Sequence, residues 1–288
     1  MYCKILKIVI LAVAFLFLGC DDPEESISTK SDEEEVTVIL PVQIQVIGSL
    51  IEGMIVCDNN NSCKQTDSDG IVSFDKFGAY DFKINDINVS SLNIDSNVTI
   101  VSPYTFFENN ETLAKNFLLL LHAFDKGSDI TDEKVSLTFS SYIPTTTSIK
   151  TFIEEKLDGE DLVYSVNEHN ITIDTEDNSI DRDGTDSIID VPTKEVYTKL
   201  DNVSNFITLA NDKNVTLGNV STNYLLSKTT PTSFTLGERY SFKAYAKAED
   251  IVVDIYDSTT KSTDSAKLII DDDNNTFITN LVSLILVK

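Results

Sequence analysis

Cys20 ends a pattern that predicts covalent lipid attachment. Lys4 and Lys7 precede an apolar run, which closes with Leu16-Phe17-Leu18-Gly19 immediately before the cysteine. A basic start, a short hydrophobic segment and a small residue ahead of a cysteine are typical of bacterial lipoprotein signals, which are cleaved before the cysteine that becomes acylated. We therefore expect residues 1–19 to be a signal peptide and Cys20 to carry the lipid.

A membrane anchor is the alternative role of this segment, because residues 5–18 are almost entirely apolar. The run is short for a bilayer core, which takes about 20 helical residues. Phe17 stands three residues before the cysteine, where such signals usually carry leucine. An uncleaved anchor and an ordinary signal peptide therefore stay open, and the acidic residues after Cys20 leave the membrane and the leaflet open.

Two further cysteines predict a disulfide. Once Cys20 is acylated, Cys57 and Cys63 are the cysteines left in the mature chain. Outside the cytoplasm, such a close pair is expected to be oxidised, and two free thiols are the alternative. A structural zinc site needs four ligands, and the chain's two histidines, His122 and His169, lie far from this pair in sequence. We therefore expect no zinc site.

Glycosylation sequons, Asn-x-Ser/Thr, occur nine times. They begin at Asn60, Asn88, Asn97, Asn110, Asn170, Asn202, Asn214, Asn219 and Asn274. In seven of them Asp or Glu stands two residues before the asparagine, whereas Leu200 and Leu217 precede Asn202 and Asn219. Acids make up 47 of 288 residues, so about one or two of the nine sequons (9 × 47/288) would carry such an acid by chance.

This pattern resembles the extended Asp/Glu-x-Asn-x-Ser/Thr sequon of the general N-glycosylation system of epsilonproteobacteria, whose transferase needs the additional carboxylate. The resemblance implies sugar attachment at the acid-preceded asparagines. These are Asn60, Asn88, Asn97, Asn110, Asn170, Asn214 and Asn274. Accidental sequons in an acidic, loop-rich protein are the alternative.

A second acidic stretch could hold calcium. Residues 174–190 carry seven carboxylates around Gly184. Calcium takes six to eight oxygen ligands from a tightly curled chain. The candidate ligands are Asp177, Asp181, Asp183, Asp186 and Asp190. The EF-hand template does not fit, because Ser179 would take its first position. A solvated acidic linker is the alternative, and we expect no other cofactor.

The charge and the missing motifs limit the classes of function. A formal net charge of −25 repels nucleic-acid phosphates and anionic lipid, so we expect no nucleic-acid partner. The chain has no P-loop, nucleophile elbow or His-Glu-x-x-His motif. A carboxylate pair of the glycosidase type stays open, because the fold rather than sequence spacing positions such a pair. An extracytoplasmic carboxylate-dependent hydrolase is therefore the alternative to a non-enzymatic protein.

The elements that must position these residues are mostly strands. Val42, Ile44 and Val46 alternate with polar residues, and turn signals stand at 59–61 and 67–70. Helices are predicted over 112–124, 148–157 and 194–209. From Asn214 onward the pattern returns to strands with short connections, which indicates an antiparallel meander or a second sandwich, closed by a strand at 277–287.

We therefore predict a mainly β fold, with two β-sandwich-like domains and a small helical segment between them. The predicted organisation is a signal peptide (1–19), an acidic tether (20–35), a β-sandwich module (36–100), a mixed segment with helices and an acidic loop (101–210) and a C-terminal antiparallel β domain (211–288).

Several motifs resemble a known module. Val46-x-Gly48, the segment 52–58 (EGMIVCD) and the segment 66–74 (TDSDGIVSF) are similar to the carboxypeptidase-regulatory-like β-sandwich of bacterial extracytoplasmic proteins. The segments 101–103 (VSP) and 116–125 (NFLLLLHAFD) resemble the region after this module in many proteobacterial lipoproteins. Glu52, in place of the usual Asp, and Lys126-Gly127-Ser128 after Asp125 depart from the pattern. The resemblance brings no catalytic residue with it.

Together these patterns predict a cell-envelope lipoprotein. The lipid at Cys20 would hold it to a membrane, on the periplasmic face or at the cell surface. Its β-rich part would be a non-enzymatic module for binding, adhesion or structural support. Its partner, a protein or another envelope component, is not identified by any motif.

Overall fold

The computed structural model describes residues 41–96, 98–125, 134–137, 148–157, 162–166, 169–216 and 223–268. These residues belong to one compact unit, which begins at residue 39. Strands predominate over helices, so the mainly β prediction is confirmed. The predicted signal peptide, Cys20, the acidic tether, Asn97, Asn219, Asn274 and the strand at 277–287 lie outside the described residues.

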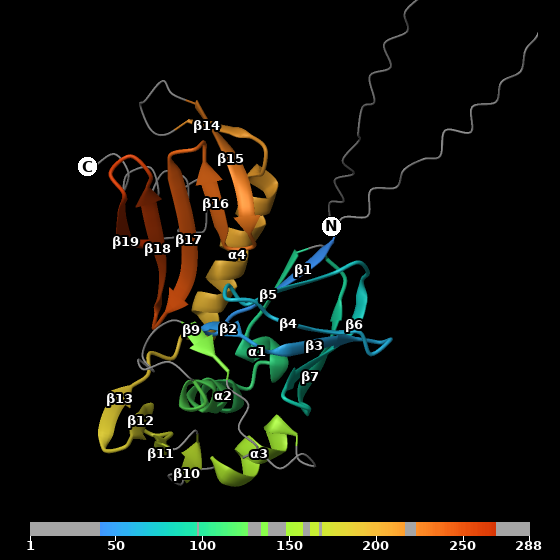
Figure 1. Cartoon of the computed structure of the whole chain (residues 1–288), viewed down its shortest axis with the longest axis vertical. Coiled ribbons are helices and arrows are strands. Elements are labelled where there is room, and N and C mark those ends of the chain that lie inside the picture. Colours follow the sequence, from blue (N-terminus) through green and yellow to red (C-terminus); the bar gives the residue numbers. More distant parts are fainter. Residues whose placement is uncertain are drawn as a thin grey trace, which may run out of the picture. The chain divides into compact units, whose positions relative to one another are not determined.

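The N-terminal strands form two sheets around a shared core (Figure 1). One sheet contains β5 (Ile71–Phe74), β1 (Val42–Val46) and β8 (Val98–Val101) in that order. The other contains β4 (Cys63–Gln65), β3 (Ile55–Asp58), β6 (Gly78–Ile84) and β7 (Ile87–Ile94). A short parallel pair is formed by β2 (Leu50–Glu52) and β9 (Lys134–Ser136). Ile44 and Phe82 are fully buried in the common core, as expected of a sandwich-like arrangement.

The buried side chain of Thr66 joins two segments of the first module. Its hydroxyl accepts a hydrogen bond from the backbone N–H of Met54 at 3.0 Å. It also donates to the backbone carbonyl of Ile51 at 2.5 Å. A hydroxyl with both hydrogen bonds made can be buried at little cost, so Thr66 fixes the approach to β3.

The turn after Thr66 is held by its own side chains and by a glycine. Asp67 Oδ1 accepts the backbone N–H groups of Asp69 and Ile71, each at 2.9 Å. Gly70 has φ +71°, and a Cβ atom there would lie 2.4 Å from the carbonyl oxygen of Val46. Only glycine fits so close to the neighbouring backbone, so this part of the TDSDG motif serves the fold.

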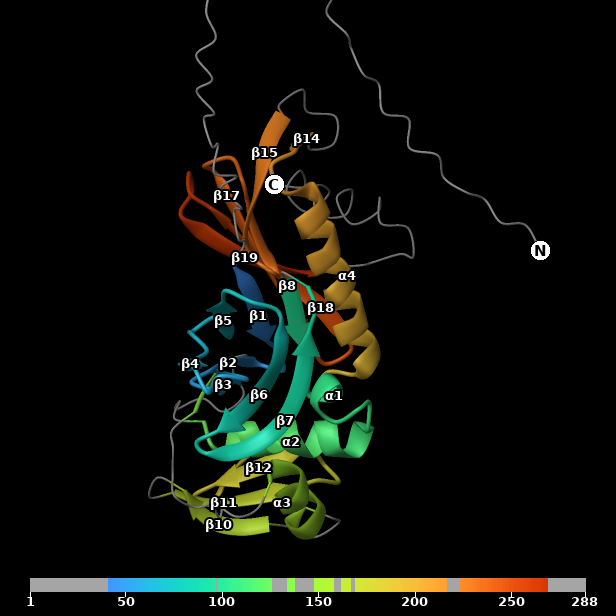
Figure 2. The ribbon, with the colours of Figure 1, turned by 90° about the vertical axis from the view of Figure 1, so that its right-hand side faces the viewer.

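A helical layer comes next along the chain, and then a small meander (Figure 2). The helices are α1 (Pro103–Phe106), α2 (Glu111–Ala123) and α3 (Ile149–Lys156). The meander contains β10 (Leu162–Val166), β11 (His169–Asp174), β12 (Ser179–Arg182) and β13 (Thr185–Ile188). Asn110 caps α2 by accepting the N–H of Leu113, and α2 contacts α1, α3, β11 and β12. The expected helices at 112–124 and 148–157 are confirmed within one residue.

The prediction of an acidic loop over 174–190 is wrong. These residues include β12 and β13, which pair with each other as a hairpin. Asp183 and Gly184 form its turn, with φ +54° and +85°. Asp-Gly is a preferred pair for a tight hairpin turn, because both positions take positive φ. The strands escaped detection because their polar residues break the apolar alternation.

The C-terminal part is a six-stranded antiparallel meander with a helix on one face. The helix is α4 (Lys194–Ala210). The strands are β14 (Asn214–Thr216), β15 (Asn223–Thr230), β16 (Ser233–Leu236), β17 (Tyr240–Lys247), β18 (Asp250–Asp257) and β19 (Ser262–Leu268). Val196, Leu200, Val203 and Ile207 recur at helical spacing and pack into one cluster with sheet residues such as Phe242. Figure 1 shows α4 lying against this sheet. Of the two predicted arrangements, the described residues therefore form the meander.

A hydrogen bond and an ion pair are among the contacts that connect this sheet and its helix to the N-terminal strands. The Tyr197 hydroxyl on α4 donates to the carbonyl of Gly48 at 2.9 Å. Lys243 Nζ on β17 lies 2.7 Å from Asp69 Oδ1 in the glycine turn.

In the described part of the chain, no helix has the length and apolar character needed to cross a membrane.

Candidate functional site

The predicted disulfide is present. Cys57 on β3 and Cys63 on β4 stand directly opposite each other and are bonded. Between them, Asp58 Oδ1 accepts the backbone N–H groups of Asn60 at 2.9 Å and Ser62 at 2.8 Å. The hydrogen bond from Ser62, followed by that from Asn60, holds the pKa of Asp58 below its usual value. The disulfide and Asp58 together fix this turn.

A pocket of about 280 Å³ lies beside this turn. It is lined by Asp58, Asn59, Asn60, Ser62, Lys64, Phe74, Asp75, Lys76, Phe77 and Tyr80. The Tyr80 hydroxyl donates to the carbonyl of Lys76. Burial raises the pKa of Tyr80, and the charges of Asp58 and Asp75 add to this rise. Phe77, in contrast, has 54 % of its surface exposed. The pocket thus combines aromatic rings with groups of both charges.

The sequon asparagines that the structure describes are all exposed. They are Asn60 in the turn after β3, Asn88 in β7, Asn110 before α2, Asn170 in β11, Asn202 in α4 and Asn214 in β14. The Asn110 side chain is used as a helix cap, because its oxygen accepts the N–H of Leu113 at 3.1 Å. Asn202 lies inside regular helix, whereas the Asn60 backbone belongs to a turn. These asparagines thus have the exposure that attachment of a sugar requires.

Of the five predicted calcium ligands, three lie in the β12–β13 hairpin, namely Asp181, Asp183 and Asp186. Asp177 precedes the hairpin and Asp190 follows it. Asp181 Oδ1 accepts the backbone N–H of Gly184 at 2.6 Å. Asp183 lies 2.6 Å from His169 Nδ1, and this contact, with the N–H of Asn170, lowers its pKa. Among the residues with described placement, no three His, Cys, Asp or Glu side chains form a group suited to a metal ion. Calcium binding stays a prediction, to be tested by calorimetric titration.

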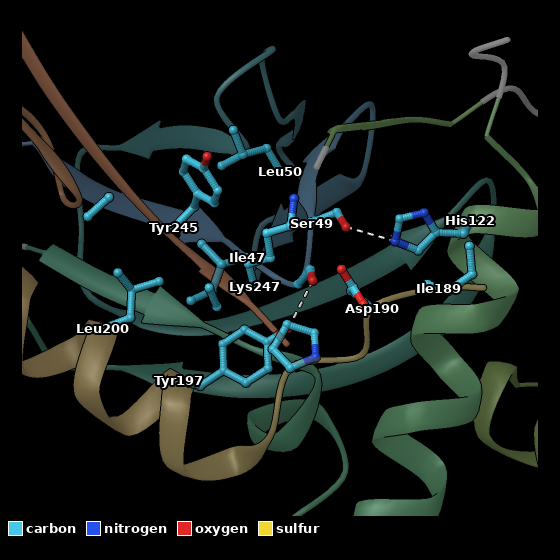
Figure 3. Close-up of a pocket in the computed structure, with 14 residues that line it drawn as sticks. Ile47, Ser49, Leu50, His122, Ile189, Asp190, Tyr197, Leu200, Tyr245 and Lys247 are labelled. Carbon is cyan, nitrogen blue, oxygen red and sulfur yellow. Dashed lines mark hydrogen bonds between the residues drawn. The ribbon is translucent and has the colours of Figure 1, made fainter. Parts of the chain in front are cut away.

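A Ser–His contact is the feature that sequence analysis missed (Figure 3). Ser49, in the turn between β1 and β2, has its Oγ 2.8 Å from Nε2 of His122 in the last turn of α2. Figure 3 shows the two side chains directed toward each other, with Asp190 beside them. They are 73 residues apart in sequence, so no local motif could have indicated the pair. In hydrolases, a hydroxyl bonded to a histidine is the arrangement of an activated nucleophile.

The surroundings of this pair favour a packing role. The cavity that Ser49 and His122 line has a volume of about 30 Å³. A space of this size holds about one water molecule, and a substrate needs far more. His122 itself is only 4 % exposed. The hydrogen bond therefore joins the β1–β2 turn to α2.

The described pockets also bear on the carboxylate-hydrolase alternative. That chemistry needs one protonated acid and a second carboxylate on the other side of the substrate. A cleft of about 370 Å³ between α1 and α4 contains one carboxylate, Asp201, whose pKa is raised by partial burial. The pocket beside the disulfide contains Asp58 and Asp75, but the lowered pKa of Asp58 opposes a role as the acid. The cleft thus lacks a second carboxylate among its described residues, and in the pocket Asp58 suits the ionised role rather than that of the acid.

The comparisons with known proteins found no match for this chain. No protein-family model matches the chain, and searches of curated proteins and of solved structures return no match.

Proposed function

We propose that this chain is an exported, lipid-anchored protein of the bacterial cell envelope, whose β-rich part is a non-enzymatic binding, adhesion or structural module. The observation that carries the proposal is the disulfide between Cys57 and Cys63. Disulfides persist in oxidising compartments and are rare in the cytosol. The bond therefore supports the export that the signal before Cys20 predicts.

The surface supports the same assignment. Every acid-preceded sequon with a described position is exposed, as attachment of a sugar requires. A chain that is strongly acidic and has exposed sequons both in strands and outside them suits an extracytoplasmic surface. We therefore include N-glycosylation in the proposal, at the seven asparagines that come two residues after an acid.

We also assign residues 36–100 to a carboxypeptidase-regulatory-like module, on the resemblance of the motifs between Val46 and Phe74. The structural support comes from the turn at residues 66–70. Thr66, Asp67 and Gly70 each have a structural task in the turn that the motif predicts. Such a module would present loops to a partner rather than perform chemistry, which agrees with the small cavity at Ser49 and His122.

The lipoprotein peptidase provides the test. Cells that make the full chain should be grown with and without globomycin, which inhibits that peptidase, and then fractionated. We expect the mature form in the membrane fraction, and an accumulating precursor that still carries residues 1–19 when the peptidase is inhibited. Normal processing under the inhibitor, or a cytosolic location, would refute the proposal. A Cys20→Ala variant is the matched control, because it keeps the hydrophobic segment and loses the acceptor.

A further inference from the structure

We propose that the sugar attached to Asn60 folds back into the pocket beside the disulfide and stacks on Phe77. This inference rests on the glycosylation included in the proposed function. It adds a defined contact site for the first sugar residues. Asn60 is itself part of the wall of this pocket, so a sugar on its side chain starts at the rim.

The pocket supplies an apolar surface that the protein itself leaves uncovered. Three rings line it, and Phe74 and Tyr80 are 4 % and 2 % exposed. Lys64 Nζ lies 5.0 Å from the centroid of the Phe74 ring and so covers that ring from one side. Phe77 keeps 54 % exposure. Single exposed apolar side chains are common, but this ring shares a pocket with a sequon asparagine. Aromatic faces bind the C–H face of sugar rings through the same apolar contact that buries other side chains.

Polar groups at the same place suit the hydroxyl groups of a sugar. The carboxylates of Asp58 and Asp75 accept hydrogen bonds, and the ammonium group of Lys76 donates them. The Tyr80 hydroxyl already donates to the Lys76 carbonyl, so it is left as an acceptor. The volume of about 280 Å³ is just below the roughly 300–1,000 Å³ typical of small-molecule sites. It therefore suits one or two sugar rings rather than a larger ligand.

The acceptor turn is rigid, which limits the directions that the sugar can take. Asp58 binds the N–H groups of Asn60 and Ser62, and the disulfide closes the turn from Cys57 to Cys63. A sugar held by a fixed turn loses less freedom on contacting Phe77 than one on a mobile loop.

Other sequons provide controls, because of the three pockets described above only this one contains a sequon asparagine. Asn88 is exposed on β7 and has an acid two residues before it, as Asn60 does. Its sugar should therefore extend into solvent. The comparison of Asn60 with Asn88 separates a specific contact from any general effect of glycosylation on stability.

The test compares thermal unfolding of the full chain made with and without the N-glycosyltransferase, for the unchanged protein, Phe77→Ala, Asn60→Gln and Asn88→Gln. We expect the sugar on Asn60 to raise the Tm by about 2–4 °C, the shift of one modest contact in a domain of this size. Phe77→Ala and Asn60→Gln should each abolish that rise, and Asn88→Gln should leave it. Nuclear Overhauser effects between Phe77 ring protons and sugar protons give a second readout that does not depend on stability.

The outcomes are distinct. One outcome is that Asn60 carries a sugar, Phe77→Ala keeps the same Tm rise, and the unchanged protein shows no Overhauser effects between Phe77 ring protons and sugar protons. This outcome would overturn the contact and leave the proposed function standing. Absence of any sugar on Asn60 in the glycosylating host would overturn both the contact and the predicted modification at this residue.

Discussion

Replacing Tyr197 by Phe should remove a hydrogen bond that connects α4 to the N-terminal strands. The Tyr197 side chain is 5 % exposed, and its hydroxyl donates to the buried carbonyl of Gly48 at 2.9 Å. Burial raises the pKa of Tyr197 well above its usual value, so the hydroxyl stays protonated and donates throughout the ordinary pH range. Phenylalanine keeps the ring and removes only the donor.

The expected loss comes from the partner that stays behind. A hydrogen bond contributes about 0.5–1.5 kcal/mol net, and a buried group left without a partner costs about 1–3 kcal/mol. We therefore expect Tyr197→Phe to lower the free energy of unfolding by about 2 kcal/mol. In a domain of this size, that loss lowers the Tm by roughly 4–8 °C.

Urea denaturation, monitored by circular dichroism, measures this decrease in the free energy of unfolding. Tyr256→Phe is the matched control, because Tyr256 on β18 is 39 % exposed. The control should change the free energy of unfolding by less than about 0.5 kcal/mol. If Tyr197→Phe lost no more stability than the control, the contact with Gly48 would not join the two parts as described.

Three further predictions concern the disulfide, an ion pair and a sequon. Replacing Cys57 and Cys63 by Ser should cost about 2 kcal/mol in urea denaturation, because a loop of sequence separation 6 is no longer closed. Hydrogen bonds from Arg239 hold the pKa of Asp257 at about 2, below its ordinary 3.8. The stability that this carboxylate contributes is present above about pH 4 and is lost as the pH falls toward 2, so Asp257→Asn should flatten acid unfolding in that range. Glycopeptide mapping should find no sugar on Asn202, which lacks the preceding acid; sugar there and on none of the acid-preceded sites would mean that the pattern is accidental.

Local signals in the sequence are sufficient for the three longer helices and the disulfide, but not for the short helix α1. The α2 and α4 segments carry apolar residues at helical spacing, and the observed helices begin and end within one residue of the predicted bounds. Cys57 and Cys63 are the two cysteines that lie beyond the predicted signal and the predicted lipidation site at Cys20. Such features depend on residues close in sequence, which a pattern can record.

Contacts between distant segments could not be predicted in this way. Ser49 and His122 meet because β1 and α2 pack in one core, and no motif in the sequence links the two residues. The pairing of β2 with β9 joins segments about eighty residues apart. The β12–β13 hairpin is a different case, because its polar residues break the apolar alternation and its Asp-Gly turn also fits the acidic pattern of a calcium loop.

The central claim, export with lipid attachment, is tested most directly by mass spectrometry of the mature protein from the membranes of its host. We predict a chain that begins at Cys20 with thioether-linked diacylglycerol, and no alkylation of Cys57 or Cys63 until the protein is reduced. A chain that still begins at Met1, or an unmodified Cys20 together with two thiols that react without reduction, would contradict the account.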